Sequence, residues 1–320
     1  MNQPITPEIL EAMVKENRSH IVLGQTAQYI PALANKDPNQ LGICMATSSG
    51  EFLTAGDSKC AFTLQSISKI LSFIYACHHY GLDHVLEKVD VEPTGEAFNS
   101  IIPFEIHRPG KPFNPLINAG AIIVSAMLPG DSTWERYEGL LNFLEGLIGF
   151  RPTLDEEVYH SELRTADRNR ALAYYLKESH LLTLDVDEAL DIYTRQCSIC
   201  MRLQDLAKIG LILAYDGQHP VTRTQHFSED IAQIAKVLMV TCGMYNASGK
   251  FAAYVGIPAK SGVSGGILAA APPKYSSQPG HVQSGYGIAV YSPAIDLSGN
   301  STAGTMLLKQ LSKTYSFSIF

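Results

Sequence analysis

The stretch Phe62-Thr63-Leu64-Gln65-Ser66-Ile67-Ser68-Lys69 is the most informative part of this chain, because it runs directly into an apolar-periodic segment at residues 70–80. That periodicity predicts a helix that begins near Gln65. On such a helix, a spacing of three residues puts the Ser66 hydroxyl and the Lys69 amine on one face, near the positive end of the helix dipole. The pattern therefore places a nucleophile beside a possible base.

Acyl transfer is the reaction for which a serine beside a lysine, such as Ser66 beside Lys69, is chemically useful. A serine hydroxyl is a weak nucleophile until a neighbour removes its proton, and a desolvated lysine with a lowered pKa can act as that neighbour. An isolated Ser-x-x-Lys pattern is short, however, and also describes two exposed residues on an ordinary helix. Other parts of the chain have to distinguish these two interpretations.

Composition limits the classes of protein to consider. The chain has 320 residues, of which 46% are hydrophobic, so one or two domains with a real core are expected. Its formal charge of −7 and the lack of a Lys/Arg cluster argue against nucleic acid or an anionic membrane as a partner. No stretch is long and apolar enough to span a bilayer, and the N-terminus has no secretory signal pattern. The sequence therefore predicts a cytoplasmic protein.

The cysteines and histidines suggest neither a disulfide framework nor a metal site. Six cysteines are spread along the chain, and in the cytosol they are expected to be mostly reduced. Cys197-Ser198-Ile199-Cys200 is a lone Cys-x-x-Cys motif that is expected to pack at the end of an amphipathic helix, with a redox or metal role as the alternative. The ten histidines form no His-Glu-x-x-His set. No metal or other cofactor is expected.

The distribution of strand and helix signals predicts the fold. Apolar runs bounded by glycine-rich turns predict strands near both ends of the chain, at 41–47, 51–55, 60–64, 251–255, 265–271 and 286–291. Helical periodicity predicts helices at 135–149, 167–181, 187–201, 203–215, 228–242 and 302–314. We expect an α/β (α+β) fold in which an antiparallel sheet from both termini is flanked by helices and an all-helical domain is inserted. Residues 1–64 and 246–320 would form the sheet domain and residues 65–245 the helical one, with the active site at their interface.

A second motif, Lys260-Ser261-Gly262, lies where a strand is expected to start. In enzymes of the β-lactamase and penicillin-binding type, a Ser-x-x-Lys serine opens a helix and such a triplet lies on a strand facing it. Unpaired N–H groups at a strand edge, together with the Ser66 N–H, could then form an oxyanion hole. The third motif of that superfamily, Ser-Asp-Asn or Tyr-x-Asn, is not evident here. Its absence argues against a β-lactamase.

Seven ordered motifs between about residues 20 and 295 resemble the serine-dependent glutaminases. They begin at Gln28, Gln65, Pro115, Ser161, Tyr193, Gly243 and Lys260 and read QYIP, QSISK, PLINAGAI, SE followed by Asn169, YTRQCS, GMYN and KSGVSGG. The resemblance implies a β-lactamase-like fold and hydrolysis of L-glutamine to L-glutamate and ammonia without a cofactor. Members of that family are commonly dimers or tetramers, so a homodimer or homotetramer is expected.

The resemblance also implies roles for individual residues. Ser66 would be the nucleophile, Lys69 the base that activates it, and Tyr245 a proton donor toward the leaving ammonia. Val263 would contribute its backbone N–H to the oxyanion hole. The substrate-contacting positions of the family fall on Tyr29, Asn118, Glu162, Asn169 and Tyr193.

These residue types suit free glutamine, which is a zwitterion. Glu162 could bind the α-ammonium group, while Asn118, Asn169 and Tyr193 could donate to the α-carboxylate. Each also has a structural alternative: Asn118 as a helix cap, Glu162 as a solvated loop acid, Tyr193 as a half-buried helix residue. Tyr29 and Tyr245 could likewise be packed aromatic residues with hydrated hydroxyls.

Two other functions stay open at this point. A β-lactamase, peptidase or esterase would use the same serine chemistry on larger substrates, but it would be expected to carry an export signal. A catalytically silent amino-acid-binding or scaffold protein would make the pairing of Ser66 with Lys69 incidental.

Overall fold

A five-stranded antiparallel sheet joins the two ends of the chain in the order β2-β1-β10-β7-β6. The computed structural model describes residues 4–97, 99–100, 110–275 and 282–320. The strands of this sheet are β1 (Gly42–Thr47), β2 (Phe52–Gly56), β6 (Ala259–Ser261), β7 (Gly266–Ala271) and β10 (Tyr286–Tyr291). The prediction of an antiparallel sheet built from both ends of the chain is thus confirmed.

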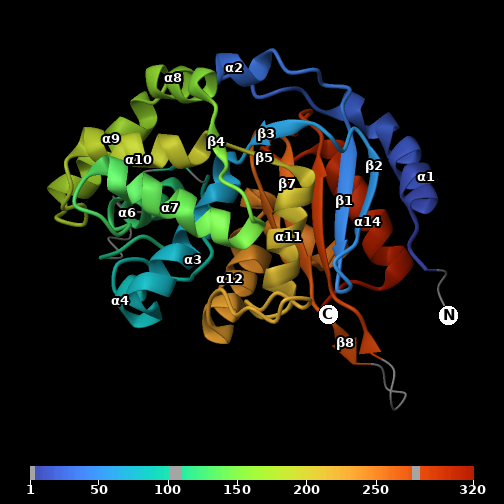
Figure 1. Cartoon of the computed structure of the whole chain (residues 1–320). Helices are drawn as coiled ribbons and strands as arrows, with labels where there is room; N and C mark the ends of the chain where they lie inside the picture. The colour runs from blue at the N-terminus through green and yellow to red at the C-terminus, as the bar shows by residue number, and fades with distance from the viewer. Residues whose placement is uncertain (1–3, 98, 101–109, 276–281) are drawn as a thin grey trace.

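Successive side chains along each strand point to opposite faces of the sheet, and different helices pack on the two faces. On β1, Ile43 and Met45 belong to a buried cluster with α1 (Pro7–Asn17) and α14 (Thr302–Tyr315), helices from opposite ends of the chain that lie side by side (Figure 1). Cys44 and Ala46 point to the other face, which α11 (Leu203–Ala214) covers. Side chains two apart on a strand share a face, so both faces of this sheet are buried.

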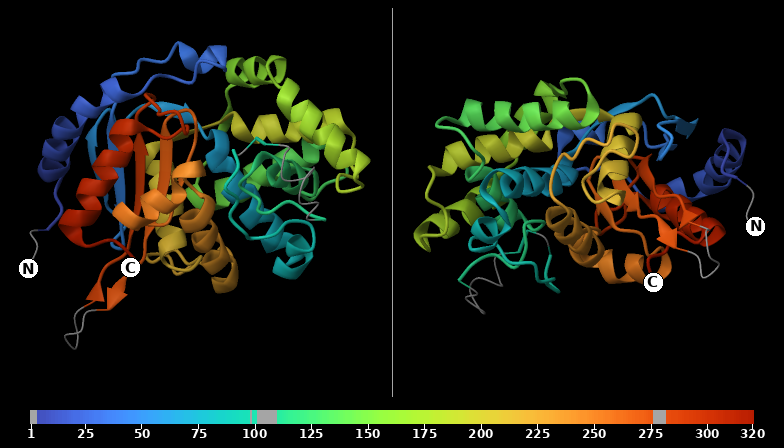
Figure 2. Two further views of the ribbon diagram at one scale, coloured as in Figure 1. Left: turned by 180° about the vertical axis from the view of Figure 1, so that it is seen from behind. Right: turned by 60° about the horizontal axis from the view of Figure 1, so that its bottom comes forward.

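Most of the remaining helices come from the middle of the chain and gather beside the α11 face of the sheet (Figures 1 and 2). Several start at a Ser, Thr or Asp whose side chain caps the first turn, as Ser132, Asp155 and Ser228 do. The helices on this side are α2 (Pro31–Ala34), α3 (Ser68–Tyr80), α4 (Leu82–Leu86), α6 (Asn118–Ala126), α7 (Thr133–Ile148), α8 (Glu156–Arg164), α9 (Asp167–Glu178), α10 (Val186–Cys197) and α12 (Glu229–Cys242). By contrast, α13 (Ser248–Tyr254) belongs to the buried cluster of α1 and α14 on the opposite face of the sheet. Short 3-10 helices are η1 (Arg18–Leu23), η2 (Gln65–Ile67) and η3 (Tyr245–Ala247), and a small hairpin pairs β8 (Lys274–Tyr275) with β9 (Val282–Gln283).

The middle of the chain also contains strands that the sequence analysis did not predict. The helix expected over 187–201 ends at Cys197, and β5 (Ile199–Arg202) follows it. β5 pairs with β3 (Ala61–Thr63) and β4 (Thr153–Leu154) in a second, three-stranded antiparallel sheet. Four residues are too few to show a strand period, so only the pairing partners reveal this strand.

The strand predicted over 251–255 is wrong, because this segment lies in α13 and its end. Phe251 and Val255 are buried, whereas the residues between them, at 252–254, are more exposed. A spacing of four residues puts Phe251 and Val255 on one face of a helix, which a strand would not do. Short apolar runs are ambiguous between the two elements, and packing against the sheet decides this one in favour of the helix.

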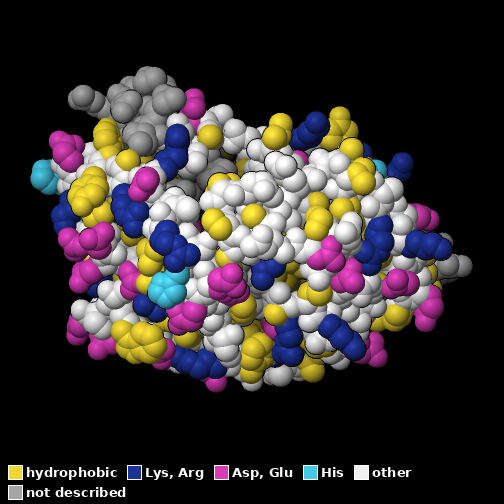
Figure 3. Space-filling model, turned by 90° about the horizontal axis from the view of Figure 1, so that it is seen from above, with side chains coloured by type: hydrophobic (Ala, Val, Ile, Leu, Met, Phe, Trp, Pro, Cys, Tyr) yellow, Lys and Arg dark blue, Asp and Glu magenta, His cyan; other side chains and the backbone are white. Residues whose placement is uncertain are grey.

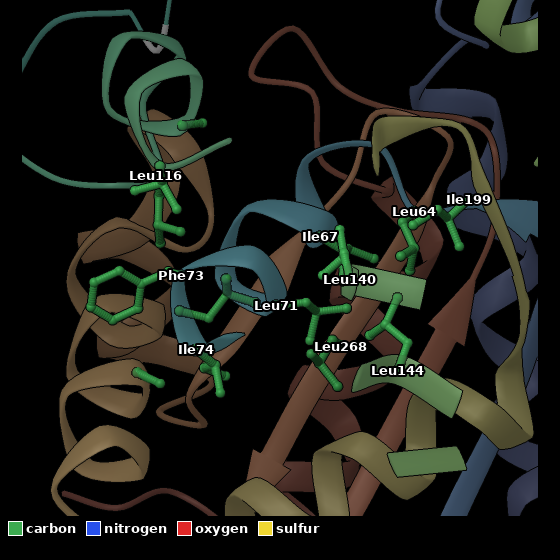
Figure 4. Close-up of a cluster of buried hydrophobic side chains, with 14 of the residues drawn as sticks. Leu64, Ile67, Leu71, Phe73, Ile74, Leu116, Leu140, Leu144, Ile199 and Leu268 are labelled. Atoms are coloured by element: carbon green, nitrogen blue, oxygen red, sulfur yellow. The ribbon is translucent and has the colours of Figure 1, made fainter. Parts of the chain in front are cut away.

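The start of α3 is anchored in the largest buried cluster of the molecule. Figure 4 shows Leu64 next to Ile199 and Ile67 near Leu268 of β7, while Phe73 lies toward Leu116 on the other side of the helix. These six side chains are at most 2% exposed. Burial of each large apolar side chain contributes about 1.5–3 kcal/mol, so the segment that carries Ser66 is fixed on both sides.

On the face seen in Figure 3, basic and acidic side chains are interspersed. Of the helices in the described part of the chain, none has the length and apolarity that crossing a lipid bilayer would need.

Candidate active site

Ser66 lies on a tight turn between β3 and α3. The residue before it, Gln65, has a φ of +48°, in the left-handed region that residues other than glycine rarely adopt. Such a conformation costs on the order of 1–3 kcal/mol and persists only where the surroundings enforce it. Here the Ser68 hydroxyl donates to the Gln65 carbonyl at 2.7 Å, and the Ile67 N–H donates to the Leu64 carbonyl at 3.0 Å. The turn therefore fixes the direction of the Ser66 side chain.

Lys69 is fully buried one helical turn beyond Ser66. Its Nζ donates to the Asn118 Oδ1 at 2.6 Å and to the Leu116 carbonyl at 3.2 Å. Burial lowers the pKa of Lys69 to about 8, against the opposing effects of Cys197 and Glu162. A substantial fraction of this amine is therefore neutral just above neutral pH, as a general base requires.

Tyr245 lies behind the serine, on η3, with a φ of +52°. Its phenol shares a hydrogen bond with Ser66 and donates to the Ser261 carbonyl at 3.3 Å. Burial raises the pKa of Tyr245 far above its ordinary value, so the phenol keeps its proton. A protonated group in contact with the nucleophile can pass a proton along.

A cavity of about 200 Å³ opens in front of Ser66. Seven of the nine site residues predicted from the sequence line it: Tyr29, Ser66, Asn118, Glu162, Asn169, Tyr193 and Val263. The other two, Lys69 and Tyr245, are buried and contact Asn118 and Ser66 of that lining. The structure thus brings all nine together from elements spread over more than 230 residues of sequence.

Two amide side chains extend the contact from Lys69 into the cavity. Because an ammonium or amine N–H must face a carbonyl oxygen, the Asn118 Oδ1 points at Lys69 and its Nδ2 donates to the Asn169 Oδ1 at 2.8 Å. The N-cap of α6 is Ile117, without a side-chain capping bond, so the helix-cap alternative for Asn118 is wrong. Among the described residues, no acceptor takes the Asn169 Nδ2, so this group can donate a hydrogen bond to a ligand.

Glu162 contributes the carboxylate of the cavity. It lies on α8, not in a loop, and accepts a hydrogen bond from the Gln65 Nε2 at 3.2 Å. Burial raises the pKa of Glu162 to about 7, although the Gln65 bond and the charge of Lys69 act in the opposite direction. Ionising a buried carboxylate that has no positive partner is costly, so this site favours a cationic ligand.

The two tyrosines that line the cavity differ in exposure. Tyr193 on α10 is 3% exposed, and the Lys69 Nζ lies 5.8 Å from the centroid of its ring. Tyr29 is 57% exposed. Tyr193 therefore forms a fixed wall, whereas Tyr29 borders the opening.

The glycine-rich turn after β6 places the Val263 backbone beside the serine turn. A Cβ at Gly262 would lie 2.5 Å from the Leu64 carbonyl oxygen, so only glycine permits this approach. Within the described residues, no acceptor takes the Val263 N–H. An N–H without a partner next to a nucleophile can stabilise an oxyanion.

Seven further residues line the cavity that the sequence analysis did not propose as site residues: Ile30, Gln65, Asn99, Thr165, Ala166, Arg168 and Cys197. Ile30, Gln65 and Cys197 lie within quoted motifs, so they could have been proposed from the sequence. Arg168 donates to the Asn99 carbonyl at 2.7 Å, a contact that no sequence pattern signals. Across 4–97, 99–100, 110–275 and 282–320, no three His, Cys, Asp or Glu side chains form a group that could hold a metal ion.

Comparison with known proteins identifies the family. Residues 24–320 match the family model described as Glutaminase. The chain is 54% identical over 312 residues to "Glutaminase 1" of Bacillus subtilis (strain 168), which covers 97% of this chain and 95% of the relative. The chain belongs to the glutaminase family. Its fold-class prediction is confirmed as a mixed α/β fold with antiparallel sheets.

Two solved glutaminase structures resemble this one closely. A probable glutaminase from Bacillus subtilis, complexed with 6-diazo-5-oxo-L-norleucine, has a TM-score of 0.89 at 50% identity, covering 100% of this chain and 98% of its own. A Bacillus subtilis glutaminase in covalent complex with 5-oxo-L-norleucine has a TM-score of 0.88 at 50% identity, covering 98% and 99%. The second complex formed by reaction of that protein with 6-diazo-5-oxo-L-norleucine.

Proposed function

We propose that this chain hydrolyses L-glutamine to L-glutamate and ammonia in the cavity in front of Ser66, through an acyl-enzyme on that serine. The observation that carries the proposal is the contact set of Ser66: it lines the cavity and is hydrogen-bonded to Tyr245, while Lys69 is buried one helical turn beyond it with a pKa lowered to about 8. The covalent complex of the Bacillus subtilis relative supports a covalent route.

Acylation begins when the Ser66 Oγ attacks the side-chain amide carbon of glutamine. The hydroxyl proton passes to the Lys69 amine, and the carbonyl oxygen becomes an oxyanion held by the Ser66 and Val263 N–H groups. The carbon–nitrogen bond then breaks as the nitrogen takes a proton from Tyr245, which regains one from the protonated Lys69, and ammonia leaves. Support for this proton path comes from the Tyr245 contact with Ser66.

Deacylation reverses the proton transfers. Water attacks the acyl carbon, its proton passes to the same base, and the bond to the Ser66 Oγ breaks as the oxygen regains a proton. L-glutamate is released, and Lys69 and Tyr245 return to their starting protonation states.

Recognition of the free amino acid uses the polar cavity lining. Glu162 pairs with the α-ammonium group, and Asn169, Tyr193 and Asn118 orient the α-carboxylate. The Asn118 Nδ2 donates to Asn169, and the Tyr193 phenol shares a hydrogen bond with Cys197, so among the described residues the Asn169 Nδ2 is the donor with no present acceptor. We expect Tyr29, which borders the opening of the cavity, to contact the bound substrate.

The finer description of the fold is part of the same proposal. In a β-lactamase-like arrangement, residues 1–64 and 246–320 form a sheet domain, residues 65–245 an inserted helical domain, and the active site lies between them. In support, Ser66 lies in η2, directly before α3, and η2 contacts the edge strand β6. Because α11 packs on β10 in one continuous core, we expect the two parts to unfold in a single calorimetric transition.

The expected assembly follows from the family resemblance, and the expected location from the sequence. We expect a homodimer or homotetramer, which light scattering coupled to gel filtration tests directly. A cytoplasmic location stays a prediction of the sequence, and cell fractionation tests it.

Ammonia release distinguishes the proposed function from its alternatives. Purified protein is assayed with L-glutamine, L-asparagine and a chromogenic β-lactam. We expect rapid ammonia release from glutamine, far less from asparagine, and no turnover of the β-lactam. Folded protein that turns over none of the three would favour a binding or scaffold role, and turnover of the β-lactam alone would favour the wider serine-hydrolase class.

A further inference from the structure

Lys260 is a second fully buried lysine near the serine, and the catalytic scheme above gives it no task. It lies on the edge strand β6 and has no exposed surface. Burial, and next the charge of Lys69, hold the pKa of Lys260 well below its ordinary value. A buried amine is costly unless its N–H groups have partners. Its partners therefore indicate what it does.

The Lys260 amine joins three segments of chain. Its Nζ donates to the Gly243 carbonyl at the end of α12, at 3.1 Å, and to the Ser261 carbonyl of its own strand, at 2.6 Å. The same Nζ lies 4.4 Å from the centroid of the Tyr245 ring. A cation or amine at this distance from an aromatic face restrains the ring.

The Ser261 carbonyl links Lys260 to the Tyr245 hydroxyl as well as to its ring. This oxygen accepts the bond from the Tyr245 phenol at 3.3 Å while it accepts the one from Lys260. A carbonyl oxygen has two lone pairs, so both bonds can exist together. Lys260 thus contacts the ring of Tyr245 and shares the acceptor of its hydroxyl.

The backbone of Tyr245 needs such support. Its φ of +52° is unfavourable for a residue with a side chain, and such conformations persist only where neighbouring contacts enforce them. The Gly243 carbonyl, two residues earlier, receives bonds from both the Lys260 Nζ and the Ser261 N–H. Lys260 therefore holds the segment before Tyr245 and the aromatic ring itself.

We propose that Lys260 is a positioning residue that keeps the Tyr245 phenol against Ser66. The inference rests on the proposed role of Tyr245 in proton transfer. Because Lys260 is fully buried, it acts through Tyr245 and not on the substrate. Its loss should reduce the rate of the chemical steps more than the binding of glutamine.

The test combines Lys260→Met with Tyr245→Phe in a double-mutant cycle. Methionine keeps the length and apolar body of the side chain and removes the donors. In the otherwise unchanged protein, we expect Lys260→Met to lower kcat about 10-fold or more with KM within about threefold. In the Tyr245→Phe background, it should lower kcat less than about twofold, because the hydroxyl it positions is gone. Lys274→Met is the matched control, since that amine also donates to a backbone carbonyl, of Ser316, but on the β8 hairpin.

Each outcome decides the matter. A folded Lys260→Met protein with unchanged kcat, or an equal loss in both backgrounds, would overturn the inference. If Lys260→Met does not fold, Lys260→Gln replaces it, because glutamine keeps N–H donors without the charge. Failure of both to fold would assign Lys260 to stability and contradict a positioning role. A Tyr245→Phe protein with full kcat would refute the role of Tyr245 itself, and absence of turnover in the unchanged protein would refute the proposed function.

Discussion

Lys69 and Asn118 are joined by a hydrogen bond of 2.6 Å between the Lys69 Nζ and the Asn118 Oδ1. The bond connects the buried amine of α3 to the first residue of α6, and through Asn118 to Asn169 in the cavity. A neutral oxygen in this place satisfies the amine without adding a negative charge. The base can therefore lose its proton near pH 8.

Asn118→Asp tests this relationship, since it places a carboxylate beside the Lys69 amine. An opposite charge at this distance raises the pKa of an amine by about 1–3 units. The neutral fraction of Lys69 at pH 7.5 then falls, and kcat falls with it. We expect the rising limb of the pH–rate profile to move to higher pH by about one unit or more, as ammonia release measured from pH 6 to 10 will show. Asn142→Asp, on the exposed side of α7, is the control and should leave the limb in place.

The unchanged protein should become more active from neutral to mildly alkaline pH. Two groups have to be deprotonated for function: Glu162, with a pKa raised to about 7 by burial, and Lys69, with a pKa lowered to about 8 by burial. Activity is therefore low when both are protonated, and log kcat/KM rises through pH 7 and levels off above pH 8. In Glu162→Gln the lower of the two inflections should vanish. A profile that is flat or falling from pH 6 to 8 would contradict both assignments.

Glu162→Gln should impair substrate binding far more than folding. The amide keeps the size of the side chain and its hydrogen bond with Gln65, but it cannot form an ion pair with an α-ammonium group. Loss of a charged hydrogen bond is worth about 1.5–3 kcal/mol, so KM should rise about 10- to 100-fold. Steady-state kinetics and thermal unfolding check this prediction. Glu157→Gln, an exposed acid of the same helix, should alter neither KM nor Tm. An unchanged KM in Glu162→Gln would remove Glu162 from the substrate site.

Gly262→Ala should lower both stability and activity. The new methyl group would lie 2.5 Å from the Leu64 carbonyl oxygen, within the turn that carries Ser66. Overpacking of this kind costs about 1–3 kcal/mol, which lowers Tm by roughly 2 to 10 °C and displaces the Val263 N–H. Gly249→Ala in α13 is the control, because its methyl group would meet no atom within 4 Å. Equal stability of the two variants, by calorimetry, would show that the approach of the two turns is not tight.

The sequence correctly predicted those elements whose hydrophobic residues recur with the period of the helix or strand that they form. The β1–β2 hairpin, α11 and α12 have clear periodicity and recognisable ends, and Ser228 caps α12 as its position suggests. Short segments were not predictable in the same way. β5 forms because β3 and β4 pair with it, and α13 forms because Phe251 and Val255 pack on the sheet. In both cases, residues distant in the sequence decide the local structure.

The site residues were found through ordered motifs, but their contacts were not. The sequence placed Asn118 among possible carboxylate donors, whereas its oxygen binds Lys69 and its amide group binds Asn169. Gln65 was quoted only as a neighbour of Ser66, yet it donates to Glu162 and carries the strained backbone of the turn. These contacts depend on how side chains from several separate elements are directed in space. The spacing of residues within one element does not predict those directions.

The most direct test of the central claim is the position at which 6-diazo-5-oxo-L-norleucine attaches to this protein. After reaction and proteolysis, peptide mass spectrometry locates the adduct. We predict a single modification on Ser66, competed by L-glutamate and absent from a folded Ser66→Ala variant that also releases no ammonia from glutamine. An adduct on another residue, or one that persists in Ser66→Ala, would contradict the assignment of Ser66 as the nucleophile.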